Sequence, residues 1–130
     1  MNPLLNLPDK FEKGVVVSNP FLQPTKIFMY TLELLHPAIK TEGPTPTEAA
    51  TVSRHWAHLQ DLAAKEQLLF AGRTLGVDDM GFASVVVRAE SEEEARAIMD
   101  RDPGIREGLF RGHLYPYQML LMGKWSPSET

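Results

Sequence analysis

The residues of this chain that could do chemistry centre on a histidine on the apolar side of an amphipathic helix. The segment His55-Trp56-Ala57-His58-Leu59 lies in a run whose apolar residues recur every three to four positions. On a helical wheel, His55 falls at about −60° from Val52, while Trp56 and Leu59 lie within about 40° of it. A buried imidazole costs stability unless a hydrogen-bond partner satisfies it. The spacing therefore predicts a histidine on the buried side with a polar partner.

The candidate partner of His55 is Asp102, in the dipeptide Asp102-Pro103. A carboxylate that accepts from one imidazole nitrogen fixes the tautomer and leaves the other nitrogen as a base. Such a pair is suited to general acid/base catalysis, and we predict His55 and Asp102 as catalytic residues. The alternative is a core histidine that is hydrogen-bonded to a helix-end carboxylate and has a structural role only.

The elements that must position this pair follow a β-α-β-β-α-β order, which is that of the ferredoxin-like α+β fold. Apolar runs predict strands over 26–36, 68–75, 82–89 and 109–124, the last interrupted by Pro116. Helical spacing and capping boxes predict helices over 45–67 and 91–102. The capping boxes pair Thr45 with Glu48 and Ser91 with Glu94. The predicted buried stripe of the first helix is Val52, Trp56, Leu59, Leu62 and Ala63.

This topology predicts where further polar residues lie. His36 ends the first strand and His113 belongs to the last, which neighbours it, so both are expected near His55 and Asp102 at one end of the domain. His58, on the rim of the buried side, is expected to be solvated. An arginine in such a pocket would favour an anionic substrate. The predicted pocket residues are His36, Arg73, His113 and Tyr115.

The sheet is expected to be covered on both faces. Residues 85–87 and 119–122 are apolar at consecutive positions, where a sheet with one solvated face would alternate. A second copy of the same sheet is the simplest cover, so we predict a homodimer. Residues 1–25 are expected to form an irregular N-terminal extension, residues 26–124 the domain, and residues 125–130 a tail.

The composition excludes several classes of protein. The formal net charge of −4, without a basic stripe, argues against nucleic acid as a partner. No apolar run approaches the roughly 20 residues of a membrane span, so no membrane partner is expected. The chain has no cysteine, which excludes disulfides and thiolate chemistry and fits a cytoplasmic protein.

The motifs together resemble the YciI-like (YCII-related) family over roughly residues 27–122. The resemblance rests on the helix histidine His55, on Ala71-Gly72, on the Ser-Glu-Glu-Glu-Ala helix start at 91–95 and on Asp102-Pro103. It implies a dimeric α+β barrel and assigns His55 and Asp102 to the active site proposed for the family. One departure is at Glu66-Gln67, where relatives usually end the helix with glycine.

Two hypotheses of function follow. The first is a small enzyme, without a tightly bound cofactor or metal, that isomerises, eliminates from or dehalogenates a lactone, organic acid or hydroxylated aromatic. The resemblance supports this class by analogy, since relatives on the barrel fold include muconolactone isomerases and dehalogenating enzymes. The second is a non-catalytic module that binds a small ligand. A metal-dependent oxygenase is a third hypothesis, but His55 and His58 lack the i, i+4 spacing of the two histidines in zinc-binding helices.

Overall fold

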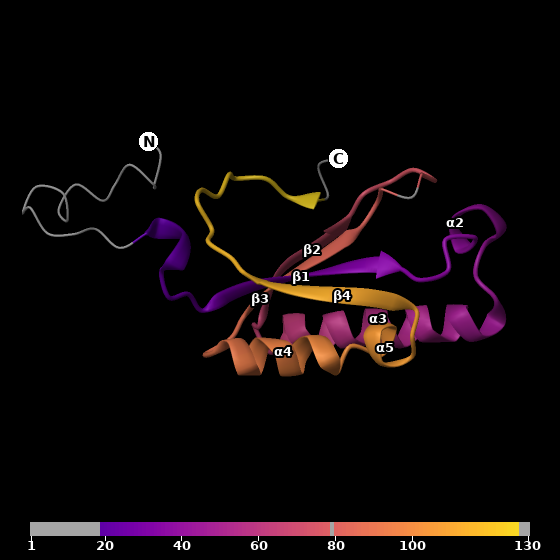
Figure 1. Cartoon of the computed structure of the whole chain (residues 1–130), viewed down its shortest axis with the longest axis horizontal. Coiled ribbons are helices and arrows are strands. Elements are labelled where there is room, and N and C mark those ends of the chain that lie inside the picture. Colours follow the sequence, from indigo (N-terminus) through magenta and orange to yellow (C-terminus); the bar gives the residue numbers. More distant parts are fainter. Residues whose placement is uncertain (1–18, 79, 128–130) are drawn as a thin grey trace, which may run out of the picture.

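The computed structural model describes residues 19–78 and 80–127 (Figure 1), so most of the predicted N-terminal extension lies outside the described residues. The strands confirm the predicted order and are β1 (Ile27–Leu34), β2 (Leu68–Arg73), β3 (Ala83–Arg88) and β4 (Phe110–Pro116). The helices are the 3-10 turn η2 (Pro20–Leu22), α2 (Ile39–Glu42), α3 (Pro46–Ala64), α4 (Glu92–Asp100) and α5 (Pro103–Arg106).

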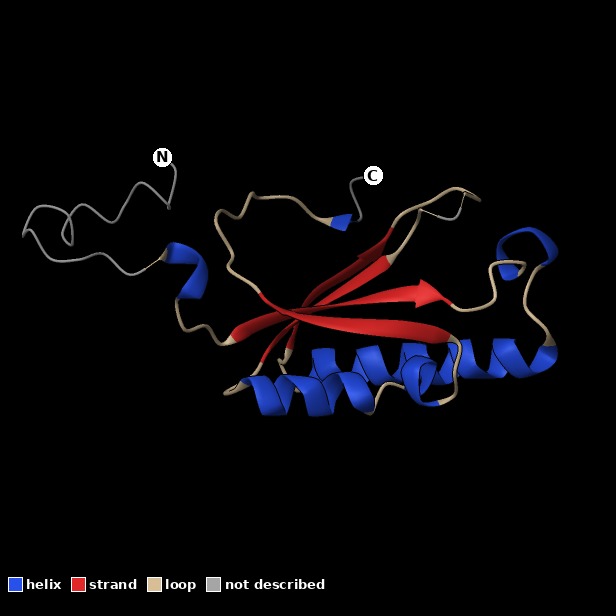
Figure 2. Cartoon of the chain, viewed as in Figure 1, coloured by secondary structure: helices blue, strands red, loops and turns tan. Residues whose placement is uncertain are grey.

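The four strands form one antiparallel sheet in the order β2-β3-β1-β4. Helices α3 and α4 cover one face of this sheet, and α5 lies on the same side (Figure 2). This is the ferredoxin-like α+β arrangement that the element order predicts. The face opposite the helices is called the open face below.

The core lies between the sheet and the helices. Along β1, burial alternates, so that Phe28, Tyr30 and Leu32 face the helices and are fully buried. On the open face the intervening residues of β1 are only half-buried, but Val86 of β3 has no exposed surface. Strand β1 is therefore fully buried on the helix side and half-buried on the open face.

The buried side of α3 differs from the predicted stripe. Leu59 and Leu62 are buried as expected, together with Thr51, but Val52 is 40% exposed and Trp56 is 60% exposed. The helix is rotated about its axis so that the positions of His55 and His58 face the core. The prediction counted apolar side chains only, whereas hydrogen-bonded polar groups also occupy this buried face.

Both predicted helix starts are present, with one difference. Thr45 and Glu48 form the complete capping box of α3. At α4, Ser91 accepts from the Glu94 backbone, but the Glu94 carboxylate accepts from the Glu90 backbone instead of completing a box at Ser91. The sequence also missed α5, a single turn that begins directly after Asp102.

The last strand is shorter than predicted. Strand β4 ends at Pro116, and residues 117–124 leave the sheet instead of extending it. Proline cannot donate to a ladder, and the next backbone bond, from Tyr117 N–H to the Ile27 carbonyl, is the last between the two segments. The C-terminal segment then passes above the sheet on its open side (Figure 1).

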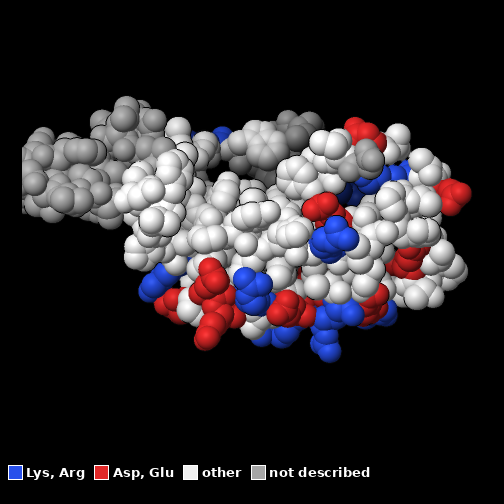
Figure 3. Space-filling view, viewed as in Figure 1, with Lys and Arg blue, Asp and Glu red and all other residues white. Residues whose placement is uncertain are grey.

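Charged side chains are unevenly distributed over the surface. In the view of Figure 3, many of them gather along the lower side, over the helices, and a smaller group lies at the upper right. Exposed apolar side chains occur around Phe21, between β2 and β3, where Leu75 is 85% exposed, and in the C-terminal segment, where Leu121 is 87% and Trp125 is 62% exposed.

Helix α3 is followed by a residue with an unusual backbone conformation, Glu66. Glu66 has φ of 59°, the only positive value among the described residues other than glycine. The Gln67 N–H donates to the Leu62 carbonyl and the Glu66 N–H to the Ala63 carbonyl, which together form a Schellman motif. This motif requires the left-handed conformation, which glycine adopts without steric cost.

Replacement of Glu66 by glycine is expected to stabilise the protein. The left-handed conformation costs a residue with a Cβ roughly 1–2 kcal/mol, a cost that glycine avoids. Part of this gain is offset, because glycine gives the unfolded chain more conformational entropy. We expect Glu66→Gly to raise the free energy of unfolding by about 0.5–1 kcal/mol, measured by urea denaturation. Glu66→Ala keeps the penalty and serves as the control. A glycine variant no more stable than the alanine variant would contradict the interpretation.

Candidate active site

Asp102 is the most deeply buried charged residue in the described part of the chain, with no exposed surface. It is the N-cap of α5, where Pro103 supplies the fixed φ of the first helical position. Its Oδ1 accepts a hydrogen bond of 2.9 Å from the Gly104 backbone N–H. The turn thus holds the carboxylate in one orientation, as N-caps generally do.

His55, from α3, completes the predicted pair. Its Nδ1 lies 2.7 Å from Asp102 Oδ1, and 13% of its side chain is exposed. An ionised carboxylate only accepts hydrogen bonds, so Nδ1 carries a proton and donates a hydrogen bond to Asp102 Oδ1. In the neutral imidazole, Nε2 is then the nitrogen without a proton, and no described residue forms a hydrogen bond with it. The structure therefore brings together the two residues that the sequence singled out.

Tyr30 is a third member of this network that the sequence did not indicate. Its hydroxyl, fully buried at the centre of β1, donates to Asp102 Oδ2 at 2.8 Å. Burial and the negative charge of Asp102 both raise the pKa of Tyr30, so the hydroxyl stays protonated and remains a donor. The one available signal was a tyrosine in a buried strand, because a buried phenol needs a partner.

The network keeps Asp102 ionised. Burial alone raises the pKa of a carboxyl group, but the hydrogen bond and charge of His55 outweigh it. The Gly104 N–H and the Tyr30 hydroxyl lower the pKa further, and the net result lies below the usual value for aspartate. The carboxylate is therefore a permanent acceptor that orients the imidazole.

Apolar packing fixes the other side of the imidazole. The Phe110 ring meets the His55 ring edge-on, with centroids 5.3 Å apart. Phe110 lies so close to Gly104 that a Cβ there would come within 2.5 Å of the ring. Glycine at position 104 thus lets the ring approach both the turn of Asp102 and the imidazole.

His58 is not the solvated residue predicted. Its Nε2 is buried and is the one buried side-chain nitrogen or oxygen of the described residues that lacks a hydrogen-bond partner. The ring bonds the backbone of Ile98 in α4, and burial lowers the pKa of His58. At neutral pH His58 is therefore an uncharged imidazole one turn from His55.

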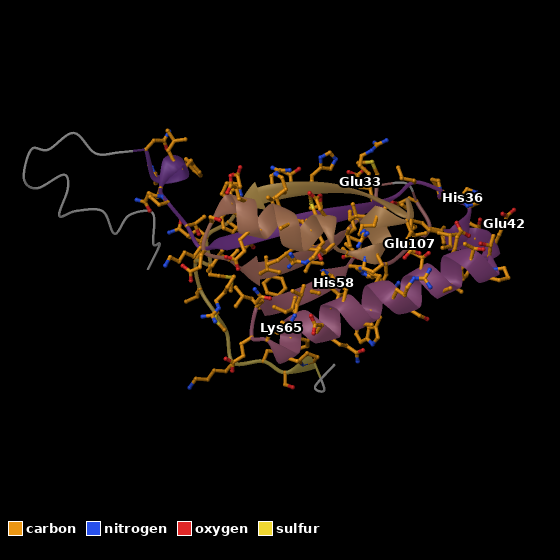
Figure 4. The ribbon with its side chains drawn as sticks, turned by 90° about the horizontal axis from the view of Figure 1, so that it is seen from below. Glu33, His36, Glu42, His58, Lys65 and Glu107 are labelled. Carbon is orange, nitrogen blue, oxygen red and sulfur yellow. The ribbon has the colours of Figure 1, made fainter. Side chains whose placement is uncertain are left out.

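His36 and His113 do not join the pair. His36 is exposed, and its Nδ1 lies 3.0 Å from Glu48 Oε2 at the start of α3. Figure 4 places it near Glu42, at the α2 end of the molecule. His113 is opposite Thr31 in the sheet and points to the open face, away from Asp102. The predicted convergence of four polar residues was wrong, because strand register decides on which face a residue lies.

The other two predicted pocket residues also lie apart from His55. Tyr115 is opposite Met29 on the open face and is 46% exposed. Arg73 ends β2 and is exposed, opposite Ala83. Neither forms a hydrogen bond with His55 or Asp102.

Two hollows of the described residues lie apart from the His55–Asp102 pair. One, of about 270 Å³, lies between the segments around Phe21 and Tyr117. The other, of about 460 Å³, is lined by Ile27, Leu69, Phe70, Met119, Met122 and Gly123. The second lies under the C-terminal segment and is predominantly apolar.

Comparison with known proteins identifies the family. Residues 29–114 match the model of the YCII-related domain, so the chain belongs to this family. No curated protein matches the chain. A similar solved structure is the 5-chloro-2-hydroxyhydroquinone dehydrochlorinase TftG from Burkholderia phenoliruptrix AC1100, in complex with 2,5-dihydroxybenzoquinone. It is 22% identical, with a TM-score of 0.54, and the match covers 71% of this chain and 93% of that one. At this identity the likeness concerns the fold.

Over 19–78 and 80–127, no helix combines the length and apolarity that a bilayer crossing requires. In the same ranges, no three side chains of histidine, aspartate or glutamate are grouped to hold a metal ion.

Removal of the Tyr30 hydroxyl is expected to destabilise the protein. Tyr30→Phe leaves Asp102 Oδ2 buried without its donor, and such a loss costs about 1–3 kcal/mol. The control is Tyr115→Phe, since the Tyr115 hydroxyl has no partner in the described structure and its removal should change stability by less than about 0.5 kcal/mol. Equal effects of the two variants on urea unfolding would contradict the role given to Tyr30.

His58 is expected to make stability depend on pH. Because its pKa is lowered in the folded state, the unfolded state binds more protons, and stability is lost as the pH falls below the unfolded value of about 6.5. His58→Gln keeps a donor for the Ile98 backbone but does not titrate. We expect the variant to lose less unfolding free energy than the wild type between pH 7 and pH 5. The exposed His36→Gln is the control, and an unchanged slope in His58→Gln would refute the interpretation.

Proposed function

We propose that this protein is a small enzyme in which His55 acts as a general acid/base oriented by Asp102. The observation that carries the proposal is the 2.7 Å contact between His55 Nδ1 and a fully buried, fully hydrogen-bonded carboxylate. A carboxylate that already accepts from Tyr30 and Gly104 holds its remaining partner in a fixed direction. The arrangement leaves Nε2 to take up or deliver a proton.

The reaction class is proton transfer coupled to isomerisation or elimination. In an elimination, Nε2 accepts a proton from the substrate while a leaving group such as chloride departs with the electron pair of its bond. The imidazolium that forms is stabilised by Asp102, and it returns its proton to solvent. None of these steps requires a redox partner.

The proposed substrates are hydroxylated aromatics, lactones or small organic acids. TftG, which shares the fold, is named as a dehydrochlorinase of a chlorinated hydroxyhydroquinone and holds a dihydroxybenzoquinone. Loss of hydrogen chloride from a hydroxylated ring needs a proton delivered to the chlorine-bearing carbon, followed by removal of a hydroxyl proton as chloride departs, and one imidazole such as His55 would serve both steps in turn. This analogy supports the class of substrate for the present chain.

We further propose that the protein is a homodimer joined through the open face. Phe70 and Tyr115 leave apolar surface on this face, and Leu121 and Trp125 of the C-terminal segment are more than half exposed. Clustered apolar surface of this kind is typical of association sites.

A ligand-binding module is the second candidate function. The hollow of about 460 Å³ beneath Met119 and Met122 is apolar and lies apart from His55. A protein that only stores or senses an apolar ligand could use this hollow, with the His55–Asp102 pair as a structural link between α3 and α5.

Turnover by variants decides between the two. The full chain is assayed with chlorinated di- and trihydroxybenzenes, lactones and hydroxy acids, following absorbance and chloride release. We expect His55→Gln to lower kcat/KM about 10²–10⁴-fold, as removal of a general base does. His36→Gln, a histidine that contacts Glu48 on the surface, should retain the wild-type rate. Compounds that bind wild type and His55→Gln equally, without turnover of either, would favour the binding module.

A further inference from the structure

We propose that Glu107 is a positioning residue that holds the His55–Asp102 pair at its working distance, an inference that rests on the function proposed above. Glu107 accepts from Thr51 Oγ1 at 2.7 Å and from Arg54 Nε at 2.8 Å, and Arg54 Nη2 forms a further close ion pair with it. Figure 4 shows Glu107 beside α3. No step of the proposed reaction uses this cluster.

The two members of the pair stand on separate elements. His55 belongs to α3, and Asp102 is the N-cap of α5, a helix of four residues. A single turn has no stability of its own, so α5 is held where its ends are attached. Its N-terminal end is attached to α3 through Asp102 and His55, and its C-terminal end through Glu107, the C-cap.

Apolar packing sets how closely α5 lies to the sheet. Ile105 rests on Gly112 of β4, where a Cβ would come within 2.5 Å of its Cδ1. This contact sets the distance of α5 from the sheet. The approach of α5 toward α3 is set by Glu107, since Thr51 and Arg54 lie within one turn of His55 on the same helix.

The charge and geometry of Glu107 suit this role. Its hydrogen bonds to Arg54 and Thr51 lower the pKa of Glu107 to about 2, so the group is ionised throughout the neutral range. An arginine that binds both carboxylate oxygens fixes direction as well as distance, which a single point charge does not. Displacements near 1 Å in such pairs are enough to impair catalysis strongly.

The tautomer of His55 reports the contact in the resting protein. We expect long-range ¹H–¹⁵N spectra of the wild type, above the titration of histidine, to show His55 with its proton on Nδ1. Glu107→Gln keeps the size of the side chain but removes its charge. In this variant we expect a mixture of tautomers, and a fall of kcat about 10-fold with little change in KM. Asp61→Asn is the matched control, because Asp61 forms an ion pair with Lys65 on α3 without contact to α5.

Each outcome decides the inference. A tautomer mixture in Glu107→Gln but not in Asp61→Asn supports it. A Glu107→Gln spectrum like that of the wild type, or equal loss in both variants, overturns it, as does a wild type without the Nδ1–H form. If Glu107→Gln does not fold, Arg54→Gln takes its place with the same criteria. The tautomer is measured without substrate, so this result does not depend on turnover. If Glu107→Gln loses the tautomer preference while the wild type is inactive, the proposed function is refuted and the positioning role of Glu107 stands.

Discussion

Burial of one carboxylate is the constraint on which the arrangement of this domain depends. Asp102 has no exposed surface, and an uncompensated buried charge would cost several kcal/mol. Three donors offset this cost, namely the Tyr30 hydroxyl, the Gly104 N–H and His55 Nδ1. They come from β1, α5 and α3, so the sheet and two helices must meet at a single side chain. Loss of any one of them leaves the charge incompletely satisfied, and the network therefore specifies how these elements pack.

The same constraint explains features that look unrelated in the sequence. Helix α5 is a single turn that presents the Gly104 N–H to Asp102. The turn needs glycine because the Phe110 ring occupies the space of a side chain, and that ring also supports His55. The rotation of α3, which exposes Trp56, turns the imidazoles toward the core, where Asp102 and the Ile98 backbone bind them. Close packing around Phe110 and the hydrogen bonds of the buried polar groups thus both determine how these elements are placed.

How much of this could be predicted depends on whether the signal was local. Helix caps, strand order and the pairing of His55 with Asp102 follow from short motifs and topology, and all are present. Tyr30 could not be assigned a partner, because its hydroxyl meets a residue 72 positions away. His113 was misplaced since a shift of one residue in register moves a strand residue to the other face. His36 was misplaced because β1 ends at Leu34, so His36 lies beyond the strand and contacts Glu48 instead. The end of β4 at Pro116 was missed because apolar residues continue beyond it, and apolarity alone does not distinguish a strand from a segment that crosses over the sheet.

The two faces of the sheet serve different ends. The three donors to Asp102 belong to one chain and lie on the helix side of the sheet. The open face and the C-terminal segment carry exposed apolar side chains, and the sheet lies between them and Asp102. Association through that face would bury these apolar side chains on the side of the sheet opposite the His55–Asp102 pair. The geometry of the pair has to be maintained from within the chain, by the attachment of α5 to α3.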